Sequence, residues 1–291
     1  MLQATMTPDE SRLPRLDALL PPEMASLAEQ IGVRKAALDL PRLFTLAVLA
    51  GAFIALGGVF ATTALAGAGA APWGPVRVLA GTVFSLGLIL VVVGGAELFT
   101  GNNLIVMAWA GGRVSTPALL RNWAVVFAGN FVGAATTALA VALAGTHRGG
   151  DGAFGQAALA IAQAKVELGF VPAVVLGMLC NGLVCLAVWL TYSARTAADR
   201  ILAVVPPISA FVAAGFEHSI ANMYFVPYAI FVSVLDPAFV ASRGLAAPAA
   251  AVTWGAFLGR NLLPVTMGNV IGGSALVGAV YWFVYLRPPR A

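Results

Sequence analysis

Charged side chains are scarce in this sequence. Only 10% of its 291 residues are Asp, Glu, Lys or Arg, whereas roughly 25% is usual for a soluble globular domain. Hydrophobic residues make up 60% of the chain, and the mean hydropathy is +0.92. This composition excludes an ordinary soluble domain and predicts packed membrane helices, in which small residues let neighbouring backbones approach closely. The net charge of +4 is small and predicts no nucleic-acid partner.

Cysteine and histidine are almost absent, with two residues of each. Cys180 and Cys185 lie five positions apart in one apolar segment, so they point in different directions on a helix and no disulfide is expected. Because the chain has no other thiols, redox chemistry and cysteine-rich metal sites are excluded, and we predict no cofactor.

Residues 1–42 form a mostly polar tail. Charged side chains mix there with prolines, without the uninterrupted apolar core of a secretory signal. After Pro21 and Pro22, apolar side chains recur at helical spacing and predict a short amphipathic helix. They are Met24, Leu27, Ile31 and Leu38. Two interpretations are open, a surface helix on the cytoplasmic side of a membrane or a mobile gate over a pore mouth.

Six apolar segments are long enough to span a bilayer, which takes about 20 residues. They are residues 43–66, 77–109, 123–145, 169–192, 201–235 and 262–286. The second and the fifth are too long for one helix. The sequence therefore predicts an all-α membrane protein whose six-span pore domain, residues 43–287, follows the tail.

Basic residues in the loops predict the orientation. With both termini cytoplasmic, the inner side holds Arg12, Arg15, Arg34, Lys35, Arg42, Arg113, Arg121, Arg195, Arg200, Arg287 and Arg290. The outer side then holds Arg77, Arg148, Lys165, Arg243 and Arg260. Since cytoplasmic loops carry the excess of Lys and Arg, this distribution favours cytoplasmic termini.

Two motifs each occur twice. G-x-E-x-x-x-x-N spans residues 95–102 and 215–222, inside the two overlong apolar segments. R-N-x6-G-N-x2-G spans residues 121–133 and 260–272, leading into the third and sixth segments. Spans one to three therefore repeat as spans four to six, over about 43–145 and 169–286. Because three is odd, the second copy is predicted to be inverted, and inverted repeats place a functional site near the midplane at interrupted helices.

Four stretches resemble the formate–nitrite transporter family. They are GGAELFTGNN, VLGMLCNGLVCLAVWLTYSARTAADRI, AGFEHSIANMYFVP and NLLPVTMGNVIGG. The resemblance runs from about Leu19 to the C-terminus. It implies an aquaporin-like fold with spans two and five broken, in the bacterial inner membrane. It also implies a homopentamer with one pore per protomer, which passes small monovalent anions, often with a proton. The N-terminal helix is similar to that of the formate branch.

The resemblance assigns roles to particular residues. His218 matches the central pore histidine, and Thr100 faces it across the pore. From their own chemistry, Asn222 and Asn269 can donate an amide to an anion or to the histidine, or else join helices by hydrogen bonds. The outer constriction is implied to be Phe84 and Phe211, and the inner one is lined by Leu88, Leu98, Phe99 and Val184. Lys165 matches a lysine of the outer vestibule, where a fixed positive charge raises the local anion concentration. Glu97 and Glu217 are expected to be structural at the helix breaks, and Asn130 to join helices.

Several functions remain open. The expected substrate is formate, with nitrite, hydrosulfide, lactate and acetate as alternatives on the same scaffold, and protons and membrane lipids are the other expected partners. An intramembrane hydrolase would need a nucleophile beside a base, but Ser219 and His218 are only chain neighbours and no G-x-S-x-G motif occurs. Because the hydrolase alternative lacks a nucleophile motif, we predict that the chain is not an enzyme. A channel for neutral solutes is the third alternative.

Overall fold

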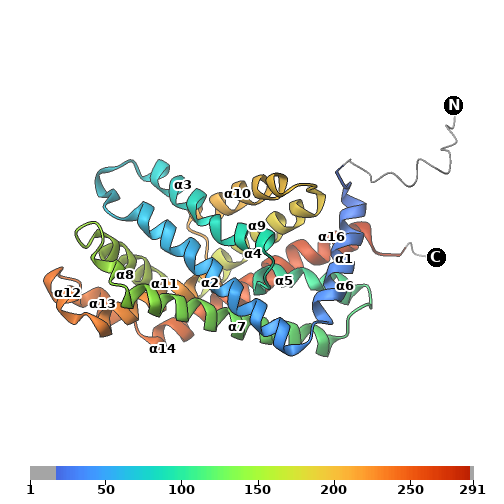
Figure 1. Ribbon diagram of the computed structural model, residues 1–291. Helices are drawn as coiled ribbons and strands as arrows, with labels where there is room; N and C mark the ends of the chain where they lie inside the picture. Colours follow the sequence, from blue (N-terminus) through green and yellow to red (C-terminus); the bar gives the residue numbers. More distant parts are fainter. Residues whose placement is uncertain (1–17, 289–291) are drawn as a thin grey trace.

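The computed structural model describes residues 18–288, and every regular element within that range is a helix (Figure 1). Six helices in this range are long and apolar enough to cross a membrane, which confirms the predicted all-α class and number of spans. Arg12, Arg15 and Arg290, which contribute to the predicted orientation, lie outside the described residues.

The first five spans are single helices or pairs of helices. They are α2 (Leu40–Leu65), α3 (Trp73–Phe84) with α4 (Leu86–Gly94), α7 (Thr116–Leu143), α9 (Phe170–Ser193) and α10 (Ala197–Ala214). The sixth span is a continuous helical run that includes two stretches of wider π-helical turns. It comprises α14 (Trp254–Ala256), η5 (Phe257–Leu262), α15 (Leu263–Val270), η6 (Ile271–Ala279) and α16 (Val280–Tyr285).

The third and sixth spans begin earlier than hydropathy predicts, at Thr116 and Trp254 rather than near 123 and 262. Each extra segment is about two turns long and carries the polar Arg-Asn pair of the repeated motif, so an apolar window misses it. The early starts have local causes, because the Ser115 hydroxyl accepts a hydrogen bond from the N–H of Ala118, and Thr253 caps α14 in the same way.

The helical backbone stops inside both G-x-E-x-x-x-x-N motifs. It ends at Gly94 and Ala214, and it resumes with α5 (Phe99–Asn102) and α11 (Ser219–Leu235). We call residues 95–98 the first loop and residues 215–218 the second loop. Each loop opens with a glycine at positive φ, 82° at Gly95 and 77° at Gly215. A left-handed residue after the last helical turn lets the following N–H bond back to the helix, here Ala96 to Val91 at 3.0 Å and Phe216 to Phe211 at 2.9 Å.

Short elements cover the two ends of the bundle (Figure 1). One end has α1 (Pro21–Ala36) with η3 (Asn103–Ile105) and α6 (Val106–Ala110), and the other has α8 (Ala153–Val166), α12 (Pro237–Ser242) and α13 (Ala246–Ala251). The turns η2 (Ala68–Ala70) and η4 (Thr146–Arg148) complete the list. The predicted N-terminal helix is thus present, and its small side chains Ala25, Ala28 and Gly32 are buried where α1 packs on α6 and η3.

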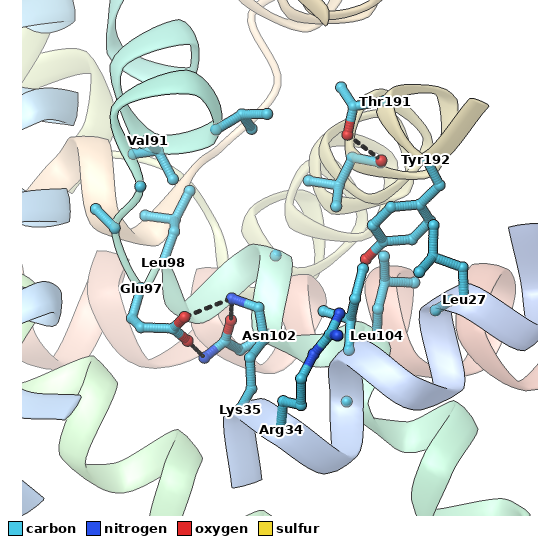
Figure 2. Close-up of a pocket in the computed structure, with 18 of the residues that line it drawn as sticks. Leu27, Arg34, Lys35, Val91, Glu97, Leu98, Asn102, Leu104, Thr191 and Tyr192 are labelled. Carbon is cyan, nitrogen blue, oxygen red and sulfur yellow. Dashed lines mark hydrogen bonds and ion pairs between the residues drawn. The ribbon is translucent and has the colours of Figure 1, made fainter. Parts of the chain in front are cut away.

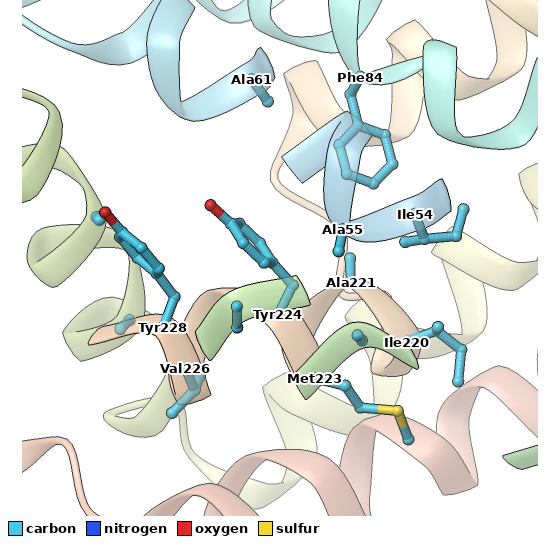
Figure 3. Packing of buried hydrophobic residues seen from close by; sticks show 14 of the residues in the cluster. Ile54, Ala55, Ala61, Phe84, Ile220, Ala221, Met223, Tyr224, Val226 and Tyr228 are labelled. Carbon is cyan, nitrogen blue, oxygen red and sulfur yellow. The ribbon is translucent and has the colours of Figure 1, made fainter. Parts of the chain in front are cut away.

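The core follows the same plan in both halves. Helix α2 packs along α7, and α9 packs along α15. A Cβ at Gly133 would clash with the carbonyl oxygen of Val48, and one at Gly272 would clash with that of Met178. These glycines of the R-N-x6-G-N-x2-G motifs are therefore required for close helix contact. Figure 3 shows α11 near the centre of this core, with the stacked rings of Tyr224 and Tyr228 side by side.

Candidate functional site

Two cavities enter the bundle from opposite ends. The α1 cavity, about 720 Å³, lies beneath α1 and is lined by residues that include Arg34, Lys35, Leu88, Glu97 and Leu98 (Figure 2). The α8 cavity, about 660 Å³, is lined by residues that include Arg77, Phe84, Lys165, Phe211 and His218. The two cavities share no lining residue, so buried side chains close the route between them.

Apolar side chains form that closure. On the α8 side, the rings of Phe84 and Phe211 meet edge to face, with centroids 5.8 Å apart. On the α1 side, Leu88 and Leu98 are both buried. Phe84 and Leu88 are four residues apart on the α3–α4 span, so the two closures lie about one helical turn apart. A charged solute that crosses this region must leave most of its water behind.

His218 lies at the inner end of the α8 cavity, with its imidazole beside the ring of Phe211. Nδ1 accepts a hydrogen bond from the N–H of Ala221 at 3.1 Å and so caps α11. Because Nδ1 is an acceptor, the neutral ring carries its proton on Nε2, which lies 2.9 Å from the Thr100 hydroxyl oxygen. His218 therefore donates to Thr100, and this bond joins the two halves of the chain.

The first loop is held by an ion pair and two amides. Lys35 of α1 donates to Glu97 Oε1 at 2.7 Å and to Asn102 Oδ1 at 3.0 Å (Figure 2). Asn102 Nδ2 donates to Glu97 Oε2 at 2.7 Å and to Asn122 Oδ1 at 2.9 Å. Asn122 Nδ2 then donates to the carbonyl of Lys35 at 3.0 Å, which closes the ring of contacts.

The second loop is held by the matching residues. Lys165 of α8 donates to Glu217 Oε1 at 2.9 Å. Asn222 Nδ2 donates to Glu217 Oε2 and to Asn261 Oδ1, both at 2.7 Å. Asn261 Nδ2 donates to the carbonyl of Lys165 at 2.9 Å. Every bond of the first set recurs here except one, because Lys165 has no bond to Asn222, whose Oδ1 is left without a partner.

One further asparagine supports each loop from the last span of its half. Asn130 accepts from the N–H of Phe99 at 2.9 Å and donates to the carbonyls of Ala47 and Glu97. Asn269 accepts from the N–H of Ser219 at 2.9 Å and donates to the carbonyls of Gly177 and Glu217. The two repeated motifs therefore interlock, because the asparagines of R-N-x6-G-N-x2-G bind the backbone and side chains of G-x-E-x-x-x-x-N.

The structure brings most of the expected site residues together. His218, Phe84, Phe211, Lys165, Glu217 and Asn222 line the α8 cavity, while Leu88, Leu98 and Glu97 line the α1 cavity. Thr100 lies fully buried between the cavities, bonded to His218. Lys165, which was expected to present a fixed positive charge to the anion, is paired through its ammonium with Glu217.

Besides Thr100, three expected site residues line neither cavity. The ring of Phe99 packs edge to face on Trp123 and Phe127, and Val184 belongs to the buried core. The amide of Asn269 is fully used in holding the second loop. Asn222 does line the α8 cavity, but both of its N–H groups are engaged, and its acceptor Oδ1 is buried without a partner.

Sequence reasoning missed the importance of Lys35, Asn102, Asn122 and Asn261. The signal was present for the asparagines, because each belongs to a motif that occurs twice. A signal was present for Lys35 too: it precedes the first residue of α2 by five positions, and Lys165 precedes the first residue of α9 by five. Arg77, which lines the α8 cavity, was counted only for orientation.

Comparison with known proteins agrees with this architecture. The family model described as formate/nitrite transporter matches residues 22–283. The chain is 45% identical over 273 residues to the formate channel FocA of Escherichia coli K12, which covers 93% of this chain and 96% of that protein. It is 40% identical over 263 residues to the formate channel FocA of Haemophilus influenzae, over 90% of this chain and 93% of that one.

A solved structure described as a pentameric formate channel with formate bound is also similar. It superposes with a TM-score of 0.81 at 42% identity, over 85% of this chain and 98% of the other. The relatives are named as channels and the family is one of transporters, so an enzymatic function has no support. Together with the six apolar helices, these matches show that the chain belongs to the formate/nitrite transporter family.

Proposed function

We propose that this protein is a proton-linked, pH-responsive channel or transporter for formate and similar small monovalent anions. It lies in a bacterial inner membrane with both termini cytoplasmic, and it assembles as a homopentamer with one pore in each protomer. Formate is proposed as the substrate because the chain is 45% identical to a formate channel over nearly its whole length. The pentamer is supported by the similarity to a pentameric channel with formate bound.

The pathway runs through the two cavities, with the α8 cavity facing out and the α1 cavity facing the cytoplasm. An anion that enters the α8 cavity passes Phe84 and Phe211 and meets His218 and Thr100. It then passes Leu88 and Leu98 into the α1 cavity. The two matched loop frameworks support an inverted repeat, since each loop is held from its own end of the bundle, by Lys35 or by Lys165.

The chemistry at the centre favours a neutral form of the substrate. Between the phenylalanine and leucine pairs an anion loses water, which raises the pKa of a weak acid and draws a proton to it. The Nε2–H of His218 and the hydroxyl of Thr100 are the polar donors at this point. The amide of Asn222 offers the anion no donor, because both of its N–H groups are engaged.

His218 links pH to the backbone in this scheme. The ring can take a second proton only at Nδ1, and that atom now accepts the N–H of Ala221. Protonation therefore breaks the cap of α11, so the charge of an arriving anion is needed to make the imidazolium tolerable. In this scheme the titration of His218 alone links the passage of a proton to the passage of the anion.

The alternatives differ in how well the geometry supports them. Nitrite or hydrosulfide transport fits the same pathway and is separated from formate only by measurement. A hydrolase fits poorly, because both ring nitrogens of His218 are engaged elsewhere and the Ser219 hydroxyl is buried with no partner. A neutral-solute channel would leave the 45% identity to a protein named as a formate channel unexplained.

The test is formate uptake by proteoliposomes that contain the full-length protein, with internal pH followed at the same time. Formate entry accompanied by protons supports the proposal, and competition by nitrite, hydrosulfide, lactate and acetate ranks the substrates. Thr100→Val is the central variant, because valine keeps the shape of threonine but removes the acceptor for His218. Thr116→Val, in a helix end away from both cavities, is the matched control. Uptake of a neutral solute without any anion uptake would contradict the proposal.

A further inference from the structure

The charged side chains that line the α8 cavity carry a net positive charge, and one residue supplies it. The charged lining residues are Arg77, Lys165 and Glu217. Lys165 and Glu217 form an ion pair with 2.9 Å between nitrogen and oxygen, and both side chains are largely buried. At a distance beyond a few ångströms this pair acts as a dipole rather than a charge. The remaining positive charge in the cavity wall is that of Arg77.

Arg77 is held by groups that do not neutralise it. Nη2 donates to the carbonyl of Val212 at 2.6 Å, and Nε donates to the carbonyl of Ala213 at 3.2 Å. No carboxylate of the described residues lies within ion-pair distance of its guanidinium. A guanidinium has five N–H donors, so three of them remain for water or a bound anion.

The position of Arg77 is that of an entry residue. It lies on the second turn of α3, and its guanidinium is 6.0 Å from the ring of Trp73, which is 74% exposed. Phe84, seven residues further on, forms the closure of the same cavity. The carbonyls that Arg77 binds belong to the last turn of α10, which ends at Ala214, and a cation is favourable at this negative end of the helix dipole. Arg77 thus joins the cavity mouth to the loop that carries His218.

We propose that Arg77 recruits the transported anion into the α8 cavity, and that the Lys165–Glu217 pair is a structural support of the second loop. The ligand is a small monovalent oxyanion such as a carboxylate, which the unneutralised positive charge of the guanidinium attracts. The inference rests on the proposed anion transport and assigns its entry step to a residue outside both repeated motifs. Arg77 also has a structural role, because its hydrogen bonds hold the end of α10 against α3.

The experiment compares Arg77→Gln, Arg77→Lys and Arg243→Gln with the parent protein in proteoliposomes. Arg243 is the matched control, because it lies at the same end of the molecule, pairs with Asp151 and lines a different, shallow pocket. Initial rates of formate uptake are measured against substrate concentration at two ionic strengths. The electrostatic screening length falls from ~30 Å at 0.01 M to ~3 Å at 1 M, so a recruiting charge acts only at the lower value.

We expect Arg77→Gln to raise the half-saturating formate concentration by about threefold to tenfold at low ionic strength. The difference disappears at high ionic strength, and the maximal rate stays within about twofold of the parent. Arg77→Lys retains the charge, so its half-saturating concentration stays near the parent value at both ionic strengths. A loss of maximal rate in both Arg77 variants with no dependence on salt would overturn recruitment and leave only the clamp on α10.

A readout independent of transport separates this inference from the proposed function. Iodide quenching of Trp73 fluorescence, isolated by subtracting a Trp73→Phe sample, reports the anion concentration near Arg77. Weaker quenching in Arg77→Gln at low ionic strength supports recruitment even if the parent takes up no formate. Equal quenching in parent and Arg77→Gln, together with equal half-saturating concentrations, overturns it. Lack of uptake of every anion by the parent contradicts the proposed function instead.

Discussion

The first and second loops share a backbone but differ in chemistry. Leu98 and His218 occupy the same place, each ending its loop in extended conformation with φ of −105° and −112°. Leu98 offers its helix no side-chain acceptor, whereas His218 caps α11 through Nδ1. The Lys–Glu–Asn framework therefore positions the loops in both halves, while the polar chemistry resides in one residue of the second loop and in the Thr100 hydroxyl that it binds.

Replacing His218 should have the largest effect on transport, because it removes the polar residue that distinguishes the second loop from the first. His218→Asn keeps an acceptor that suits a helix N-terminus, but it cannot titrate near neutral pH. We expect formate uptake to continue with a weaker pH dependence and fewer accompanying protons over about pH 5–8. His218→Phe removes the cap and the bond to Thr100, so uptake should fall at least about tenfold, the loss expected when more than about 1.4 kcal/mol of stabilisation is removed.

Proteoliposome uptake with an internal pH probe checks both variants. Leu98→Phe, which also places a phenyl ring at the end of a loop, controls for the bulk of the new ring. If His218→Asn keeps the pH profile and proton stoichiometry of the parent, then His218 serves only as a neutral donor, and the proton reaches the anion from water.

Replacing the loop carboxylate should cost more stability in the second loop than in the first, because the ion pair of the second loop is more deeply buried. Glu217→Gln leaves Lys165 charged and unpaired, and breaking a buried pair this way costs about 3–5 kcal/mol. Glu97→Gln should cost less, because the Lys35 side chain is 26% exposed against 14% for Lys165, and Lys35 also keeps its bond to Asn102. Thermal unfolding in detergent measures the difference.

The double variant Lys165→Met with Glu217→Gln is the matched control. It removes both charges and should recover much of the lost stability, as expected when the penalty comes from an unpaired buried charge. An equal loss in Glu97→Gln and Glu217→Gln, with no recovery in the double variant, would contradict the difference between the two frameworks.

Much of this architecture could be predicted from sequence because its signals are local. Span number follows from apolar length, and the two motifs mark the loops by repetition. The partners of those motifs could not be predicted, because Asn122 meets Asn102 only when α7 crosses the first loop. The roles of Asn130 and Asn269 illustrate this limit. Amide chemistry makes Asn269 a candidate for the pathway, whereas its repeat partner Asn130 is expected to join helices, and the structure gives both the same contacts.

Side-chain direction is the other property that spacing does not determine. Phe99 and Leu98 are neighbours in the first loop and its helix, yet Leu98 lines the α1 cavity and Phe99 packs on Trp123 and Phe127. Arg77 lies in a span that hydropathy identifies, but its partners are carbonyls 135 and 136 residues away along the chain. No pattern in one sequence reports such a contact.

Leu98→Ala tests the apolar residue that occupies, in the first loop, the place of His218. Leu98 takes the place of His218 but only closes the α1 cavity with Leu88. Truncating it should widen that closure, so we expect uptake to rise severalfold and selectivity for formate over larger carboxylates such as lactate to fall. Leu104→Ala, which also truncates a buried leucine at the α1 cavity, tests whether a general loosening of the bundle has the same effect. Unchanged rate and selectivity in Leu98→Ala would show that Leu98 does not limit passage.

The smallest effect should come from Asp236, at the far end of the helix that His218 caps. Its carboxylate accepts from His147 Nε2 at 2.9 Å, from Arg148 Nη2 at 2.7 Å and from the N–H of Phe239 at 3.0 Å. These bonds, led by that of His147 and then that of Arg148, hold the pKa of Asp236 well below its usual value of ~3.9. A carboxyl whose pKa is lowered by folding stabilises the protein above its unfolded pKa, and the contribution is lost as the pH falls through the folded value.

Asp236→Asn therefore imitates the protonated carboxyl and should lower the unfolding temperature by a few degrees at neutral pH. The difference from the parent should shrink once the pH falls below about 4, where the parent also begins to lose the interaction. Formate uptake should be unchanged, because Asp236 lines neither the α1 nor the α8 cavity. Unfolding temperatures measured from about pH 3 to 8 check the expectation, with Asp151→Asn as control, since that exposed carboxylate pairs only with Arg243. A stability difference that stays constant over this range would mean that the charge of Asp236 does not hold the end of α11, and that only its cap on α12 matters.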